Sequence, residues 1–183
     1  QDVGDARYMY KYYSLLRKYA LGNFKEFVLE ITKDPAMLRY LNGYLNTKTA
    51  PDENYARELQ ELFTLGKGPL VFYTEADVRA AARVLTGYTV NATTISSAFD
   101  PNRHDTGNKQ FSTYYQNKVI LGKTGANGAK ETEELIDMLF LQEETALYLC
   151  RKLYRFFVYY EIDAATEANV ILPMANLFRA KNY

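Results

Sequence analysis

Apolar residues at helical spacing run through most of this chain, and cap and stop residues bound each stripe. The first stripe is Tyr12, Leu15, Leu16 and Tyr19, and a later one is Val78, Ala81, Ala82 and Leu85. Predicted N-caps precede the stripes at Asn23, Asp34 and Thr74, and predicted helix ends follow at Gly66 and Gly87. We therefore expect a helical region over residues 5–86.

The pattern changes over residues 88–125, where Thr, Asn, Ser, Gly and aromatic residues replace the helical stripes. Short β-compatible runs at 88–92, 109–115 and 118–122 predict a small β-hairpin there. Helical periodicity returns at 131–141, 144–160 and 164–182, which makes 131–182 a second helical region. The predicted fold is mainly α: a multi-helix globular domain with one irregular insertion at about 88–125. We expect residues 1–183 to be a single domain or a fragment of one.

Composition excludes several classes of protein. The chain has 22 basic and 22 acidic residues and no basic run, so we expect no nucleic-acid partner. No stretch approaches the roughly 18 consecutive apolar residues of a membrane span. The single cysteine, Cys150, excludes an internal disulfide and a multi-cysteine metal site. No cofactor is evident from the sequence.

The helix predicted in 51-PDENYARELQELFTLG-66 has a polar ridge and a separate apolar face. At 100° per residue, the ridge covers an arc of roughly 100° and contains Asn54, Arg57, Glu58 and Glu61. The predicted core face is Tyr55, Leu59, Leu62 and Phe63. The ridge is either a solvated face with an Arg57–Glu61 pair or a site. In a site, Asn54 and Arg57 are the candidate ligand-binding residues, and Glu58 and Glu61 the candidate acid–base residues.

The only histidine, His104, is followed directly by Asp105 in 99-FDPNRHDTGNKQF-111. A His–Asp pair can transfer protons or hold an oxygen-rich metal site, so His104 and Asp105 are candidate catalytic residues and the candidate metal ligands. Two adjacent residues cannot form a site alone. An enzyme would therefore need Glu58 or Glu61 as a further group. The alternative is a surface histidine beside a turn-forming Asp-Thr-Gly.

The run 146-ALYLCRKLYRFFVYY-160 is rich in tyrosine and phenylalanine. Because Leu147, Cys150, Leu153 and Tyr154 recur at helical spacing, core packing is the preferred interpretation. A carbohydrate- or partner-binding surface is the alternative.

Several motifs resemble those of one bacterial family, domain of unknown function 1800, in the same order. They are DPAMLRYL (34–41), PDENYARELQELFTLG (51–66), YTEADVRAAARVLTGY (73–88), HDTGNKQF (104–111) and RKLYRFFVYYEID (151–163), the last similar to Bacteroidetes-type members. Asp52 departs from the family motif, which usually has Asn there. The resemblance implies a fragment of a longer chain and an exported protein of the periplasm or cell surface. It implies no activity, because none is established for the family.

Three functions follow from these observations. The first is a binding or accessory component of a cell-envelope system, with an envelope protein or a carbohydrate as partner. The second is a hydrolase that acts on an envelope or carbohydrate substrate through Glu58 or Glu61 and the His104–Asp105 pair. In the third, the polar motif is a purely structural salt-bridge network.

Overall fold

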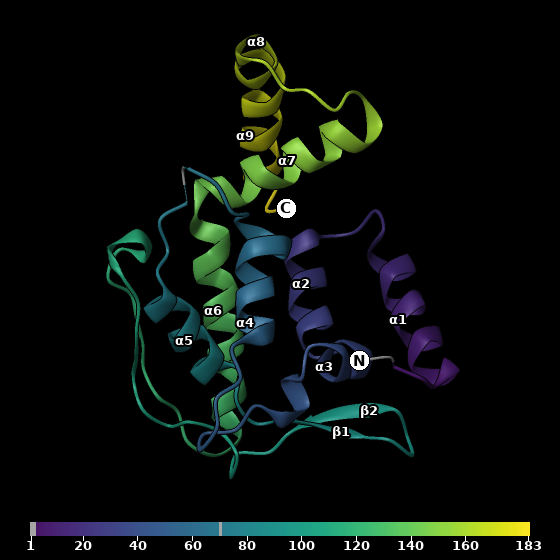
Figure 1. The fold of residues 1–183 in the computed structure, drawn as a ribbon, viewed down its shortest axis with the longest axis vertical. Coiled ribbons are helices and arrows are strands. Elements are labelled where there is room, and N and C mark those ends of the chain that lie inside the picture. Colours follow the sequence, from purple (N-terminus) through teal and green to yellow (C-terminus); the bar gives the residue numbers. More distant parts are fainter. Residues whose placement is uncertain (1–2, 70) are drawn as a thin grey trace.

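Side-chain caps determine where the N-terminal helices begin. The computed structural model describes residues 3–69 and 71–183, and places α1 at Ala6–Tyr19, α2 at Phe24–Thr32, α3 at Pro35–Tyr40 and α5 at Glu75–Val84 (Figure 1). The side chains of Asn23 and Asp34 accept amide hydrogen bonds from the first turns of α2 and α3. Thr74 and Asp77 form a reciprocal capping box at α5. These caps satisfy amides that a helix start leaves unpaired, and they confirm the predicted starts.

The helix predicted within 51–66 changes geometry halfway along. It is α-helical as α4 over Asn54–Glu58 and π-helical over Leu59–Thr64, and Gly66 ends it with φ 83°. A π turn holds one more residue than an α turn, so side chains beyond it change direction. Gln60 is fully buried, whereas Leu62 is 49% exposed. The predicted core position of Leu62 is therefore wrong, because the helical period does not hold through the π turn.

The insertion contains two antiparallel hairpins. β1 (Tyr88–Asn91) pairs with β2 (Ser96–Phe99), and β3 (Lys109–Gln110) pairs with β4 (Val119–Ile120). A predicted run covers β1, and two others overlap β3 and β4, but β2 was not predicted. Short 3-10 turns lie at Gly43–Leu45, Thr113–Tyr115 and Gly125–Ala129. The prediction of a mainly α fold with an irregular insertion and small hairpin structure is confirmed.

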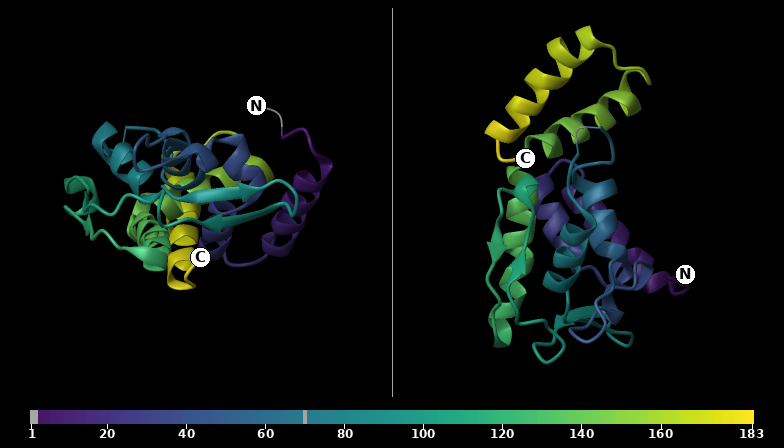
Figure 2. Two further views of the ribbon diagram at one scale, coloured as in Figure 1. Left: turned by 90° about the horizontal axis from the view of Figure 1, so that it is seen from below. Right: turned by 60° about the vertical axis from the view of Figure 1, so that its left-hand side comes forward.

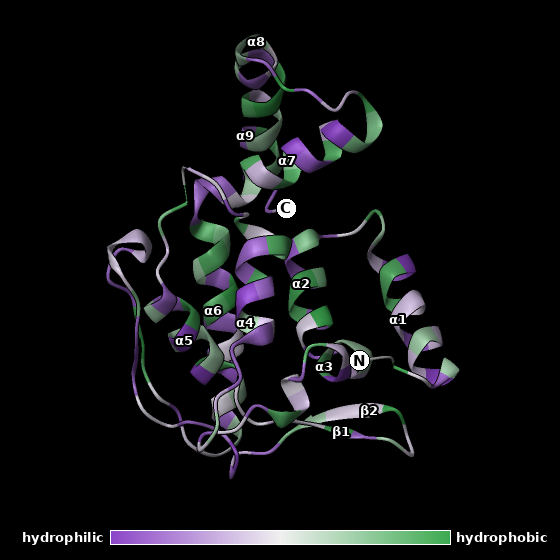
Figure 3. Cartoon of the chain, viewed as in Figure 1, coloured by the Kyte–Doolittle hydropathy of each residue, from purple (hydrophilic) through white to green (hydrophobic). Residues whose placement is uncertain are grey.

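The main core lies between α2, α4, α5 and α6 (Lys130–Leu141). Helix α6 runs behind α4 and α5, and Figure 3 shows its hydrophobic stretches beside a hydrophilic outer side of α4. The fully buried members that hold these helices together include Leu59, Val78, Ala81, Leu135 and Leu139. Core packing thus fixes α4 between α2 and α5, which determines what each side of α4 faces.

The C-terminal helices extend from this body (Figures 1 and 2). α7 (Glu143–Phe157) packs against α9 (Leu172–Ala180), which follows α8 (Ala164–Thr166) and a π-helical segment at Glu167–Ile171. Cys150 lies in this second core, and burial raises the pKa of its thiol to about 11. The core prediction is confirmed for Cys150 but not for Leu153, Phe156 or Phe157, which are exposed at the far end of α7. Within the described residues, none of the helices has the length and apolar character needed to cross a bilayer.

Candidate functional site

Arg57 joins α4 to α5 through two parallel hydrogen bonds. Its Nη1 and Nη2 donate to Oε1 and Oε2 of Glu75 at 2.9 and 2.6 Å. Nη2 also donates to Glu53 at 3.2 Å, and Nη1 lies 3.7 Å from Glu61. Planar guanidinium and carboxylate groups match in this geometry, which fixes orientation as well as contact. The hydrogen bonds from Arg57 lower the pKa of Glu75.

The other predicted ridge residues do not form one surface. Glu61 stays near Arg57 and also lies 3.5 Å from Lys67 Nζ. Asn54 is exposed, and its main-chain N–H donates to Asp52 Oδ1 at 2.9 Å. Asp52 therefore accepts a hydrogen bond at the start of α4, although the N-cap residue of this helix is Glu53. Among the described residues, Glu58 forms no ion pair with Arg57, although both belong to the predicted arc.

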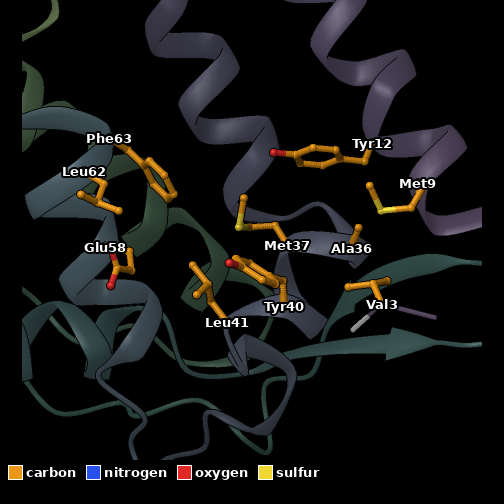
Figure 4. A pocket seen from close by; sticks show the side chains of 10 residues that line it. All are labelled: Val3, Met9, Tyr12, Ala36, Met37, Tyr40, Leu41, Glu58, Leu62 and Phe63. Carbon is orange, nitrogen blue, oxygen red and sulfur yellow. The ribbon is translucent and has the colours of Figure 1, made fainter. Parts of the chain in front are cut away.

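Glu58 faces an apolar cavity of about 520 Å³ (Figure 4). Helices α1 and α3, the residues Val3 and Leu41 outside them, and the π turn after α4 supply the rest of the lining: Val3, Met9, Tyr12, Ala36, Met37, Tyr40, Leu41, Leu62 and Phe63. A second cavity, of about 570 Å³, adjoins it towards α2 and α7. Both share Tyr12, Met37, Leu62 and Phe63. We call these two adjoining cavities the apolar groove.

His104 lies inside the protein and not on a surface loop. Its side chain is 1% exposed, and Nδ1 is 2.9 Å from the carbonyl oxygen of Thr86. Its ring packs on Phe99 with centroids 5.1 Å apart. Nε2 is 3.0 Å from Glu131 Oε1, but this approach is not well aligned for a hydrogen bond. The interpretation of His104 as a surface histidine is therefore wrong.

A buried ionic network surrounds His104. Glu131 and Lys109 are both fully buried, and Lys109 Nζ donates to Glu131 Oε2 at 2.6 Å. Lys109 also donates to the main-chain oxygen of Asp105. Arg83 donates two hydrogen bonds to the Asp105 carboxylate, at 2.7 and 3.0 Å. We call His104, Asp105, Lys109, Glu131 and Arg83 the buried network.

Opposing effects set the charge state of the two carboxylates in this network. Burial by itself raises the pKa of Glu131, but His104, Lys109 and the Lys123 amide outweigh it, so the pKa falls below its usual value. Burial opposes the Arg83 hydrogen bonds at Asp105 in the same way, and its pKa is also lowered. Both carboxylates are therefore held in the ionised form, with cations as their partners.

Within the described residues, the contacts of the ridge and those of the His–Asp pair are separate. Among the described residues, no hydrogen bond or ion pair links His104 or Asp105 to Glu58 or Glu61, and neither cavity of the groove is lined by the His–Asp pair. No group of three or more His, Cys, Asp or Glu side chains within 3–69 and 71–183 is arranged to hold a metal ion. Lys109 and Arg83 instead supply positive charge next to the acidic members of the network.

Sequence reasoning did not identify Glu131, Lys109 or Glu75 as partners. Lys109 lies within the 104–111 motif, so its place beside His104 and Asp105 was a usable signal. Glu131 and Glu75 look like ordinary acidic residues in the first turn of a helix, which is a common stabilising arrangement. Only long-range packing distinguishes them from that role.

A family model matches the entire chain. Its description is Protein of unknown function (DUF1800), and the match covers residues 1–183. No curated protein matches the chain. No solved structure matches it either.

Proposed function

The chain belongs to the family described as Protein of unknown function (DUF1800), and since that description carries no activity, we propose a function from the geometry of the chain itself. The protein is a binding domain whose apolar groove takes up an amphipathic helical segment of a partner protein. The observation that carries this proposal is the pair of adjoining cavities that share Tyr12, Met37, Leu62 and Phe63.

The size and lining of the groove suit this kind of ligand. Each cavity lies within the roughly 300–1,000 Å³ range of ligand pockets, and the two share four lining residues. Helical segments bind such grooves through apolar residues spaced one turn apart. Met9 and Met37 add flexible side chains that adapt to different apolar partners.

Exposed apolar side chains continue from the groove onto α7. Phe156 and Phe157 line the second cavity and are 81% and 75% exposed. Leu62 contributes to both cavities and is itself half exposed. A large contiguous apolar surface of this kind marks an interaction site more often than it marks ordinary surface.

In this proposal the ion pairs of Arg57 and the buried network hold the helices around the groove in place. Arg57 clamps α4 to α5 through Glu75, so the other side of α4 presents Glu58 and Leu62 in fixed positions. The buried network plays the same part beneath the insertion, where it links α5 (Arg83), the loop of His104 and the start of α6 (Glu131). This is the structural interpretation of the motif, combined with a binding function elsewhere on α4.

The hydrolase alternative has less support. It needs the imidazole of His104 to reach a substrate together with Glu58 or Glu61, and a general base must lie within hydrogen-bond reach of the proton it removes. The ring of His104 is 1% exposed and lies against Thr86, Phe99 and Glu131. Glu58 faces a different space, the apolar groove.

We also propose that the protein works in the cell envelope. The support for this is the resemblance to the family. Its members often carry export signals and are often encoded beside sulfatase-like proteins. Fractionation of cells that produce the full-length protein tests it. Recovery in periplasmic or surface fractions is expected, and recovery with cytoplasmic markers alone would contradict it.

Direct binding tests the groove. The probe is a fluorescein-labelled peptide of about 15 residues, enough for roughly four helical turns, with leucine or phenylalanine at i, i+3, i+4 and i+7. Fluorescence anisotropy should show saturable binding to the unaltered protein. Leu62→Asp should weaken that binding at least tenfold, because it replaces an apolar contact shared by both cavities with a charged group that an apolar ligand would desolvate.

The matched control is Leu121→Asp. Leu121 is 62% exposed and lines neither cavity of the groove. This variant should bind the peptide as the unaltered protein does. Equal weakening by both variants, or no binding by the unaltered protein, would rule out the groove as the site.

A further inference from the structure

We infer that Glu58 makes the groove selective for a helical segment that carries a lysine or arginine beside its apolar residues. This inference rests on the binding function proposed above. It identifies the chemical class of the partner segment and the residue that selects it.

The charges that line the groove are few. Among the described residues lining the first cavity, Glu58 is the one charged side chain. Among the described residues lining the second cavity, Lys152 is the one charged side chain. The remaining lining is aliphatic, aromatic or methionine in both. A ligand that fills the groove therefore meets one negative and one positive group.

Glu58 lacks a cation within the described part of the chain. No hydrogen bond or ion pair joins its carboxylate to another described side chain. The adjacent cation, Arg57, is engaged by Glu53, Glu61 and Glu75 on the other side of α4. A ligand that covered Glu58 with apolar atoms alone would desolvate an unpaired carboxylate, which is unfavourable. A ligand ammonium or guanidinium at this position removes that cost.

Lys152 gives the second cavity a positive charge, whereas Glu58 gives the first a negative one. The Nζ of Lys152 donates to the carbonyl oxygen of Leu62 at 3.1 Å and lies 5.1 Å from the ring centroid of Tyr148. An ammonium group has three donors, so two remain for a ligand carboxylate. Because Leu62 lies in both cavities, Glu58 and Lys152 are on either side of it. The preferred segment therefore carries its basic side chain towards Glu58 and an acidic one towards α7.

Three peptide series test the selectivity. All peptides share the apolar stripe described above. The three series differ in the residue at one test position, which is lysine, glutamate or glutamine. Within each series, the test position differs from peptide to peptide along the edge of the stripe. Anisotropy gives the Kd of each peptide. At one position or more, the unaltered protein should bind the lysine peptide about tenfold more tightly than the glutamate peptide, a typical effect of one charge pair at a partly desolvated site.

Charge reversal supplies the decisive comparison. Glu58→Lys should invert the preference at the same position, and Glu58→Gln should abolish it. Glu133→Lys is the matched control, since Glu133 is exposed on α6 and lines neither cavity of the groove. It should retain the preference of the unaltered protein. Circular dichroism establishes that each variant is folded before its Kd is compared.

The possible results separate this inference from the function on which it rests. Binding without any lysine preference, or a preference that survives Glu58→Lys, overturns the role of Glu58 and leaves the groove as a binding site. Failure of every peptide to bind the unaltered protein overturns both.

Discussion

Arg57 and Glu75 join consecutive helices by two parallel hydrogen bonds, although both side chains remain partly exposed to solvent. Exposed ion pairs contribute little to stability, because water and salt screen them. Two bonds between planar groups nevertheless define the orientation of one helix against the other. The value of this pair is thus geometric: it orients α4, which carries Glu58 into the lining of the groove.

Arg57→Lys should separate geometry from stability. Lysine keeps the charge but cannot form the two parallel bonds to Glu75. We expect the Tm to fall by less than about 4 °C, because the pair is exposed, while the affinity for the groove peptide decreases. Differential scanning calorimetry and anisotropy measure the two effects. A large loss of Tm with unchanged affinity would contradict the orienting role.

Glu131→Gln should reveal the pH dependence of the buried network. The pKa of Glu131 is lowered in the folded protein, so its contribution to stability is fully present above its unfolded pKa of about 4.5 and is lost as the pH falls through the folded pKa. At pH 7 the variant should be less stable than the unaltered protein, by about 3 kcal/mol. This difference should shrink below about pH 4.5.

Urea unfolding at a series of pH values measures that difference in unfolding free energy. Glu133→Gln, an exposed change on the same helix, serves as the control and should have little effect at any pH. A Glu131→Gln difference that stays constant from pH 7 to pH 3 would show that the charge of Glu131 does not stabilise the fold.

His104→Ala should destabilise the protein without changing the groove. The substitution removes a buried ring and leaves Glu131 without its His104 neighbour, so we expect a loss of about 2–4 kcal/mol in unfolding free energy. The affinity of the folded variant for the groove peptide should be unchanged, since His104 lines neither cavity. Retained stability with lost binding would instead place His104 in a functional site.

Gly87→Ala should lower the free energy of unfolding. Gly87 has φ 105°, and a Cβ there would lie 2.9 Å from the Phe99 ring and 3.2 Å from His104 Cβ. We expect a loss of more than about 1 kcal/mol, from the unfavourable backbone conformation and the close contacts together. Gly68→Ala is the matched control, because an added Cβ there meets nothing within 4 Å. Thermal unfolding of both variants gives the comparison.

Local rules predicted the helix starts well. The caps at Asn23, Asp34 and Thr74 depend on residues within three positions of each other, so the sequence alone identifies them. The insertion at 88–125 was also visible as a loss of helical periodicity. Strand β2 was not, because Ser96–Phe99 lacks an alternating apolar pattern and is stabilised by pairing with β1.

Residue spacing in the sequence could not predict which side chains of the candidate site contact one another. A helical projection correctly grouped Arg57 with Glu61, but it could not show that α5 would supply Glu75 and leave Glu58 on the groove side. His104 and Asp105 were singled out by residue type, and their partners Glu131 and Arg83 come from helices more than 20 positions away in the chain. Chain folding, and not local pattern, decides which charges meet.

The π turn at Leu59–Thr64 gives the groove an unusual origin. It differs from an ordinary α turn by one extra residue, and everything after it is rotated by about 100°. Leu62 and Phe63 lie inside this π segment and line both cavities of the groove. Because a π turn holds one more residue than an α turn, we expect deletion of one residue in this segment to change the directions of Leu62 and Phe63 and so to remove this wall of the groove.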